Sequence, residues 1–399
     1  MRNRIRPAAI AMITGAAVAL SGCGADDQTG SDASDETTPH GYVEGAQEKP
    51  EPQISLAYTA TGDRRLRLID VATEATSTVD LSIPARRLDE DGRFVYATDG
   101  TTIEVVDSGG WTVDHSDHVH YYRAPSAALG TVTASAAVTS IAGAGPLTAI
   151  GSEDGSVMLL DRKALENGDV TELRTLSTGS TSGFAVPYRD GLVMARGTDP
   201  GKPADTLVHA DAQGTSLGTE QRCADPRGAA MLRNVVAVSC EQGIALFTTT
   251  VGRVSSQLLE YGSRGPRATD LTFRPRSNYA AAPTPAGVWA INSATRTLEW
   301  TASADPIATA VAPGRDANLV ELTEAATLRS VTIGDGRLIA AAEIPGAGAD
   351  SALTVDSARA YLSAPATDQI VEVDHADALR VARTFPTEGA PELMVEVGR

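Results

Sequence analysis

The sequence has little cysteine, little basic charge and no long apolar run beyond its first 22 residues, and each shortage excludes a class of protein. Three cysteines in 399 residues cannot form a disulfide scaffold. Lys and Arg number 33 against 51 Asp and Glu, a net charge of −18 that argues against nucleic acid or an anionic membrane surface as the main partner. After residue 22, no stretch approaches the roughly 20 apolar residues that a membrane-spanning helix needs. The plentiful glycine and proline are typical of a turn-rich β protein.

The first 22 residues have the order of a bacterial lipoprotein signal. Three arginines precede the apolar run Ala8–Leu20, whose 13 residues are too few to span a bilayer. The next element, Leu20-Ser21-Gly22-Cys23, resembles a lipobox. We therefore predict a signal peptide over 1–22, lipidation of Cys23, and an extracytoplasmic protein anchored to the outer face of the cytoplasmic membrane through that lipid alone. The alternative is an ordinary secretory signal with an incidental cysteine.

Residues 23–53 have the composition of a flexible tether. They contain eight acidic residues against one lysine and few apolar side chains. Such a segment cannot bury enough surface to offset the entropy of ordering, so we expect it to be disordered in isolation. The element His40-Gly41-Tyr42-Val43-Glu44 breaks this pattern with a histidine and a tyrosine.

Residues 54–399 repeat one unit, in which short strands alternate with tight Asp-Gly or Gly-Asp turns. A strand that ends in an apolar residue followed by aspartate recurs, with weaker equivalents between, at intervals of about 40 to 50 residues, the period of a β-propeller with four strands per blade. The clearest markers are Ile69-Asp70, Val106-Asp107, Leu160-Asp161 and Val373-Asp374.

The repeats predict an all-β fold, a single β-propeller domain over 54–399. Eight markers favour eight blades, and seven is the alternative. The first unit lacks its inner strand, which the segment 392–397 can supply, so that the C-terminal strand closes the ring and protects the sheet edges. The competing fold is a pair of β-sandwiches, which would need a linker near residue 200. The one helical candidate, Asp161–Asp169, has the character of a local insertion.

The two remaining cysteines, Cys223 and Cys240, are 17 positions apart. In an exported chain this pair predicts a disulfide. A metal–thiolate site is less favoured, because no histidine lies close to either cysteine in the sequence.

Three of the six histidines fall within six residues, in the run Asp114-His115-Ser116-Asp117-His118-Val119-His120. Side chains alternate along a strand, so His118 and His120 point to the same face, and a turn can bring His115 alongside. Converging imidazoles suit Zn²⁺, with Asp114 or Asp117 as a further ligand or as an acceptor for an imidazole N–H. The alternatives are rim histidines that hydrogen-bond to neighbouring polar groups, or a cluster that binds metal without a physiological role.

Other motifs with known chemistry are absent from the sequence, including GxSxG, HExxH and the phosphate-binding loop. The histidines at 209 and 375 each lie near an aspartate at a repeat marker and are expected to stabilise turns. The three tryptophans are expected to fill gaps between blades.

The secretion signal, an acidic linker containing PHGYVEGAQE, the propeller pattern and the run DHSDHVHYYRAP together resemble the periplasmic zinc metallochaperones of the AztD type. The resemblance extends over the chain after the signal and is specific at the HxxHxHYYR run and the paired cysteines. It implies a β-propeller that binds Zn²⁺ and passes it to the solute-binding protein of a zinc ABC importer. Carried over residue by residue, it makes His118 and His120 the best ligand candidates, then His115, with Asp117 as a secondary candidate.

A mobile N-terminal histidine segment is a feature of that family. Here it shrinks to His40, with Glu44 and Glu48 as candidate oxygen donors. We hypothesise that His40 folds over the hairpin site as a fourth ligand that is easy to displace.

The sequence thus predicts a monomeric, non-enzymatic zinc carrier of the cell envelope. The alternative is a propeller that acts as a protein–protein scaffold without metal. A third class, a propeller enzyme such as a lactonase or quinoprotein, would need inward carboxylates that bind Ca²⁺ or a cofactor pocket.

Overall fold

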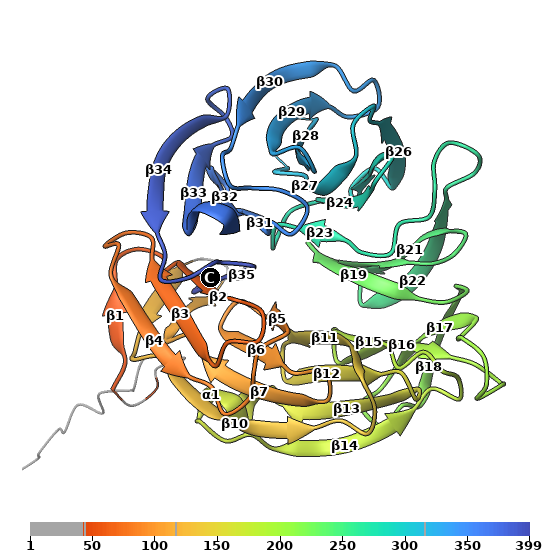
Figure 1. Ribbon diagram of the computed structural model, residues 1–399. Helices are drawn as coiled ribbons and strands as arrows, with labels where there is room; N and C mark the ends of the chain where they lie inside the picture. Colours follow the sequence, from red (N-terminus) through yellow and green to blue (C-terminus); the bar gives the residue numbers. More distant parts are fainter. Residues whose placement is uncertain (1–42, 44, 116–117, 315–316) are drawn as a thin grey trace, which may run out of the picture. The chain divides into compact units, whose positions relative to one another are not determined.

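The β-propeller prediction is confirmed by the arrangement of the sheets. In the described part of the chain, eight sheets contain four antiparallel strands each, and a ninth sheet contains three. The four-stranded sheets, numbered here 1 to 8 in chain order, follow one another around a ring (Figure 1) within the compact unit Gly41–Arg399. The computed structural model describes residues 43, 45–115, 118–314 and 317–399.

Sheets 1 to 4 are each listed from the strand nearest the ring centre outward. They are sheet 1, with β35 (Leu393–Val397), β2 (Ser55–Thr59), β3 (Arg65–Asp70) and β4 (Thr76–Asp80); sheet 2, with β5 (Arg87–Glu90), β6 (Phe94–Thr98), β7 (Thr102–Asp107) and β10 (Ala127–Thr133); sheet 3, with β11 (Val138–Ala144), β12 (Leu147–Ser152), β13 (Ser156–Asp161) and β14 (Glu172–Ser177); and sheet 4, with β15 (Ala185–Tyr188), β16 (Gly191–Arg196), β17 (Thr206–Ala210) and β18 (Ser216–Arg222).

Sheets 5 to 8 complete the ring in the same order. They are sheet 5, with β19 (Arg227–Leu232), β20 (Val235–Ser239), β21 (Gly243–Thr250) and β22 (Arg253–Glu260); sheet 6, with β23 (Thr272–Phe273), β24 (Tyr279–Thr284), β25 (Gly287–Asn292) and β26 (Thr297–Ala302); sheet 7, with β27 (Ile307–Val311), β28 (Asn318–Thr323), β29 (Thr327–Thr332) and β30 (Leu338–Glu343); and sheet 8, with β31 (Leu353–Val355), β32 (Arg359–Ala364), β33 (Gln369–Asp374) and β34 (Arg380–Pro386).

The aspartates that mark the repeat end the third strand of their sheets, and their side chains form the turns that follow. The Asp70 carboxylate accepts hydrogen bonds from the backbone N–H groups of Ala72 and Thr73, at 3.0 and 2.9 Å. Asp161 does the same for the first turn of α1 (Arg162–Glu166), the helix expected there. A second short helix, the 3-10 turn η1 (Pro365–Thr367), precedes β33. The backbone N–H groups of such a turn have no partner on a neighbouring strand, and an aspartate at this position accepts hydrogen bonds from them.

The core is divided among the junctions between sheets. Each of the eight junctions contains its own cluster of buried apolar side chains, and the cluster between sheets 8 and 1 includes Tyr361 from one sheet and Leu56 and Tyr58 from the other. Trp289 lies fully buried between sheets 5 and 6, as expected for a gap-filling tryptophan. The ring is therefore held by repeated side-by-side packing.

The predicted closure of the ring by the C-terminal strand is confirmed. β35 pairs with β2 through five residue pairs, from Ser55 with Val397 to Thr59 with Leu393. Beyond the strand, the Gly398 backbone N–H donates to the Gly92 carbonyl at 2.7 Å, which ties sheet 1 to sheet 2. Sheet 1 therefore combines strands from both ends of the repeat array.

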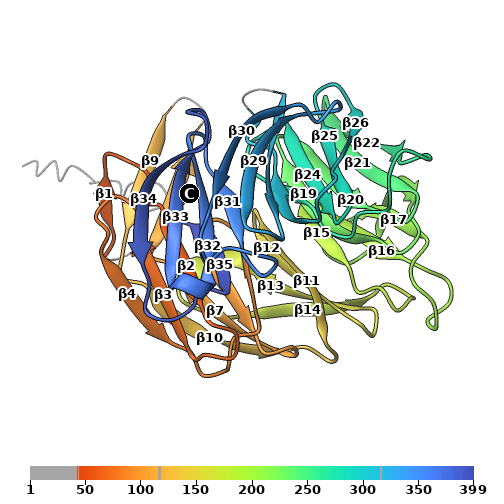
Figure 2. The ribbon, with the colours of Figure 1, turned by 45° about the horizontal axis from the view of Figure 1, so that its top comes forward.

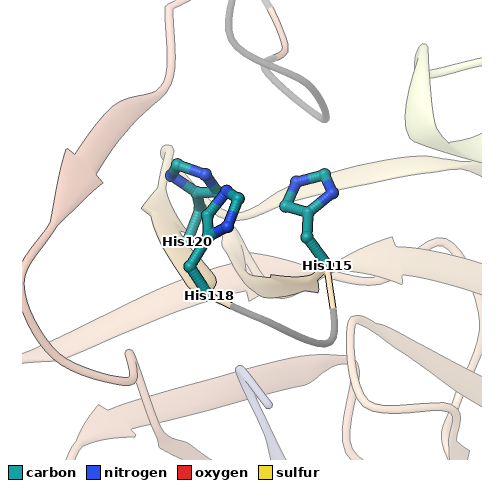
Figure 3. A group of neighbouring side chains, drawn as sticks. All are labelled: His115, His118 and His120. Atoms are coloured by element: carbon teal, nitrogen blue, oxygen red, sulfur yellow. The ribbon is translucent and has the colours of Figure 1, made fainter.

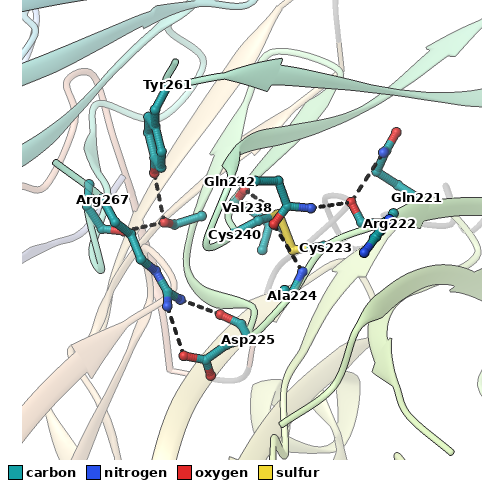
Figure 4. Close-up of a disulfide and its surroundings, with 12 residues drawn as sticks. Gln221, Arg222, Cys223, Ala224, Asp225, Val238, Cys240, Gln242, Tyr261 and Arg267 are labelled. Carbon is teal, nitrogen blue, oxygen red and sulfur yellow. Dashed lines mark hydrogen bonds and ion pairs between the residues drawn. A yellow bond between two sulfur atoms is a disulfide. The ribbon is translucent and has the colours of Figure 1, made fainter. Parts of the chain in front are cut away.

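The predicted disulfide joins Cys223 to Cys240, whose Cα atoms are 5.0 Å apart. Both cysteines are fully buried between sheets 4 and 5. Figure 4 shows the disulfide and the hydrogen bonds made by neighbouring residues. The side chain of Gln242 contacts the loop on both sides of Cys223: its amide nitrogen donates to the Arg222 carbonyl at 3.2 Å, and its oxygen accepts from the Ala224 N–H at 3.2 Å.

Among the described residues, no helix is long and apolar enough to cross a bilayer.

Replacing both disulfide cysteines by alanine should lower the free energy of unfolding by about 3 kcal/mol, because a cross-link over this separation restricts the unfolded chain. Calorimetry of C223A/C240A should show a melting midpoint several degrees below that of the wild type. Wild type whose disulfide has been reduced, and which is kept reduced during the measurement, should melt close to the variant. A double variant that melts with the oxidised wild type would contradict the stabilising role.

Candidate metal centre

The three clustered histidines lie on a hairpin that interrupts sheet 2. β8 (Gly110–Asp114) and β9 (Val119–Arg123) are inserted between β7 and β10, the third and fourth strands of that sheet. They do not join the propeller sheet but form a separate three-stranded sheet with β1 (Gln47–Lys49). Figure 2 shows β1 and β9 side by side at the edge of the ring. We call β8, β9 and the turn between them the histidine hairpin.

The fold of the hairpin brings the histidines to its end. The His115 backbone N–H donates to the His118 carbonyl at 3.0 Å and closes the turn. Val113 pairs with His120, and Trp111 pairs with Tyr122, so these side chains share one face with His118. The register therefore confirms the expected alternation of side chains, with His118 and His120 on the same face of the hairpin.

Figure 3 shows the three imidazole rings together at this end of the hairpin. The ring centroids are 4.9 Å apart between His115 and His118, 4.9 Å between His118 and His120, and 5.3 Å between His115 and His120. One candidate ligand atom from each residue lies within 4.8 Å of the other two. His118 is exposed and the other two are half-buried, so the cluster can be reached from solvent.

The donor set fits a borderline metal ion such as Zn²⁺. With Zn–N bonds of about 2.0–2.1 Å, two nitrogens of a tetrahedral site are about 3.3 Å apart, so the rings must draw together by no more than about 1.5 Å. Side-chain torsions can supply that movement at the end of a hairpin. Three imidazoles would leave one tetrahedral position for another ligand.

A small apolar cluster supports the base of the hairpin. Trp111 and Tyr122 stack with ring centroids 5.5 Å apart and bury Ala46, which lies just before β1. The Arg93 guanidinium lies 3.9 Å from the Trp111 ring centroid and forms a 2.7 Å ion pair with Asp107 at the end of β7. Trp111 therefore joins the hairpin to sheet 2, where the sequence had predicted a filler between blades.

Two ion pairs join the hairpin to other sheets. Arg123 lies 3.2 Å from Asp70 of sheet 1. Asp114 lies 2.9 Å from Arg276, in the loop between β23 and β24. That loop belongs to sheet 6, four sheets away from sheet 2 in chain order. Asp114, considered from the sequence as a metal ligand, is thus engaged by an arginine. Both partners are partly exposed, so the pair contributes about 0–1 kcal/mol.

The N-terminal segment places a carboxylate beside the histidine cluster. Gln47, Glu48 and Lys49 form β1, although the sequence predicted a disordered tether through residue 53. A Glu48 carboxylate oxygen lies 2.7 Å from Nδ1 of His120. Burial raises the pKa of Tyr122, and the Glu48 carboxylate beside it adds to the effect. The strand forms because an edge of the hairpin is free to pair with it, which the local composition could not indicate.

The other predicted residues lie elsewhere. His209 and His375 are buried in the propeller, away from the hairpin, in line with a structural role. Burial lowers the pKa of His209, which packs against the Tyr188 ring at 6.1 Å. Four predicted residues fall outside the described part of the chain: His40, Glu44, Asp117 and the lipidation site Cys23.

No protein-family model and no curated protein matches the chain. Among solved structures, the crystal structure of AztD from Citrobacter koseri has a TM-score of 0.73 and 18% identity, and the match covers 87% of this chain and 98% of AztD. An apo structure of that protein gives 0.71 and 18%, over 86% and 97% of the two chains. The dihydro-heme d1 dehydrogenase NirN, in complex with DHE, gives 0.59 and 15%, over 88% and 76%. The predicted AztD-type propeller is confirmed at the level of the fold.

Proposed function

We propose that this chain carries Zn²⁺ on the histidine hairpin and delivers it to the solute-binding protein of a zinc ABC importer. The observation that carries the proposal is the convergence of His115, His118 and His120, whose candidate ligand atoms lie within 4.8 Å of one another. Imidazole nitrogens are ligands that Zn²⁺ prefers, and three of them would leave a position open for exchange. The AztD-like fold and the sequence resemblance support the same function.

The exposure of the site favours transfer by ligand exchange. His118 is exposed at the end of a hairpin, so an acceptor can add its own histidine or carboxylate before the donor ligands leave. Zn²⁺ has no geometric preference from its d electrons, and a fifth ligand can enter without a large barrier. His40 on the N-terminal segment, as the fourth ligand, would be the first to be displaced. In this proposal the protein is a carrier and catalyses no reaction.

The proposed location is the outer face of the cytoplasmic membrane. The signal-like residues 1–22 and the lipobox-like cysteine at 23 support export and lipid anchoring. The Cys223–Cys240 disulfide fits an oxidising compartment. The propeller would then act as a monomer held near the importer by its tether.

Metal analysis and a transfer assay test this function. After dialysis, the purified protein should retain close to one Zn²⁺ per chain and should regain it on titration. Mixed with the metal-free solute-binding protein, it should release zinc at a rate that rises with acceptor concentration, as direct exchange requires. H40A should bind zinc more weakly, because the site loses its fourth ligand, and unchanged affinity and transfer rate in H40A would contradict a role for that residue.

Three results separate the alternatives. Stoichiometric zinc with acceptor-dependent release supports the carrier. A protein that binds no metal supports the scaffold. Bound Ca²⁺ supports the enzyme class.

A further inference from the structure

The strand β1 is held by fewer residue pairs than the other two strands of its sheet. It pairs with β9 through three residue pairs, Gln47 with Arg123, Glu48 with Tyr122, and Lys49 with Tyr121. The opposite edge of β9 is held by β8 through five pairs and a closed turn. Gln47 and Glu48 are exposed. Short, exposed edge strands contribute little stability of their own, so β1 is the most easily detached strand of this sheet.

One buried side chain fastens β1 to the hairpin. Ala46, 9% exposed, precedes the strand and packs against Trp111 and Tyr122. Residues two apart on a strand share a face, which places Glu48 on the same side as Ala46 and directs it along the hairpin toward His120. The position of the carboxylate therefore depends on the attachment of the strand.

Glu48 occupies one nitrogen of His120 and leaves the other for metal. Its carboxylate oxygen lies 2.7 Å from Nδ1, so the contact favours the tautomer whose proton is on Nδ1. Nε2 then carries the free lone pair, and Glu48 does not belong to the group of converging ligand atoms. A carboxylate behind a ligating histidine orients the ring and raises its basicity.

We propose that the attachment of β1 sets the metal affinity of the histidine hairpin, with Glu48 as the positioning residue for His120. With β1 in place, the ring is fixed in the tautomer and orientation that bind the metal. When β1 detaches, His120 loses its carboxylate and the site binds more weakly. The N-terminal segment thus controls retention and release. This inference rests on the proposed zinc function and specifies how the same site is regulated.

The test compares three full-chain variants by zinc titration against a competing chelator. E48Q keeps the shape of the side chain and removes its charge, and should weaken zinc binding about 10-fold or more, the usual effect of losing such a partner. E51Q removes the same charge from the exposed part of the same segment and should bind within about twofold of the wild type. A46D introduces a charge into the Trp111–Tyr122 contact, should detach β1, and should match E48Q.

The double variant A46D/E48Q shows whether Glu48 acts through the strand. If β1 only serves to place Glu48, the two changes should not add, and the double variant should bind as E48Q does. Additive losses would overturn the coupling. If E48Q bound zinc as tightly as the wild type, the positioning role of Glu48 would be overturned. The proposed function would stand in that case, because the wild type would still bind zinc.

A measurement without metal tests the same contact independently. The ¹⁵N shifts of the His120 ring in the metal-free protein should report a proton on Nδ1 in the wild type and E51Q. E48Q and A46D should show a mixture of the two tautomers. A merely structural role of β1 would not move this equilibrium, so an unchanged shift in both variants would overturn the inference. If the wild type bound no zinc, the proposed function would fail and control of affinity by β1 would fail with it, while the ring shifts would still show whether Glu48 positions His120.

Discussion

Replacing His118 and His120 together by alanine is expected to lower zinc affinity by about four orders of magnitude. Binding free energies of roughly 10–16 kcal/mol for four-ligand zinc sites correspond to about 3 kcal/mol per ligand, and the double variant loses two ligands. His115 alone cannot hold the ion against water or a competing chelator. Titration against a chromophoric chelator measures the loss, and the stabilisation of the protein by added zinc should disappear with it.

The control for this variant lies on the same strand. Val119 and Tyr121 alternate with the two histidines and point to the opposite face of β9. V119A/Y121F should therefore retain the zinc affinity of the wild type. The histidine variant should keep its melting midpoint without metal, because the hairpin lies outside the eight propeller sheets. Wild-type affinity in H118A/H120A would place the metal site elsewhere in the chain.

Removing Glu392–Arg399 should have the largest effect on stability. The deletion takes the inner strand from sheet 1 and exposes apolar surface at its junctions, where Val397 is fully buried and Met394 is 5% exposed. Burial of such side chains contributes about 1.5–3 kcal/mol each, and the backbone partners of β2 are lost as well. The loss is comparable with the roughly 5–15 kcal/mol that stabilises an average domain.

Far-ultraviolet circular dichroism during heating measures this loss. The truncated chain should melt at least about 10 °C below the wild type or fail to fold. A peptide that spans 389–399 should restore part of the stability, and the same peptide with Val395→Pro, which cannot pair fully, should not. A truncated chain with an unchanged midpoint would show that the closing strand is dispensable.

The repeat could be predicted from the sequence because its markers are local. An aspartate at the end of the third strand forms the next turn with its own carboxylate, as Asp70 and Asp161 do, so the marker and the structure that it makes lie within a few residues. The missing inner strand of the first unit then left the C-terminal segment as its partner. Repetition made this inference strong, because every unit repeats the same local rule.

The centre of the site was predictable for the same reason. His118 and His120 share a face because of strand alternation, and His115 needs only a turn to join them. The hairpin as a separate sheet was not predicted, and neither was the contact of Asp114 with Arg276. That contact joins residues far apart in the sequence, and nothing near either one indicates the other.

The position of Glu48 could not be predicted from the residues next to it in the sequence. The sequence suggested an oxygen donor in the tether, whereas the structure places the carboxylate behind a histidine ring. The strand that carries it has three polar residues and no hydrophobic pattern. It forms because the edge of β9 offers backbone partners and Ala46 finds a buried position, and both conditions depend on the rest of the fold.

The closing strand also determines when the ring can be completed. β2 is made early, but its inner neighbour β35 is made only after all the other units. Until then Leu56 and Tyr58 lie on a sheet edge that can pair with other chains. Pairing across so large a sequence separation is slow to form. A chain interrupted during synthesis would therefore expose an unpaired strand edge, however many complete units it had. Newly made protein would need protection from aggregation until its last strand is synthesised.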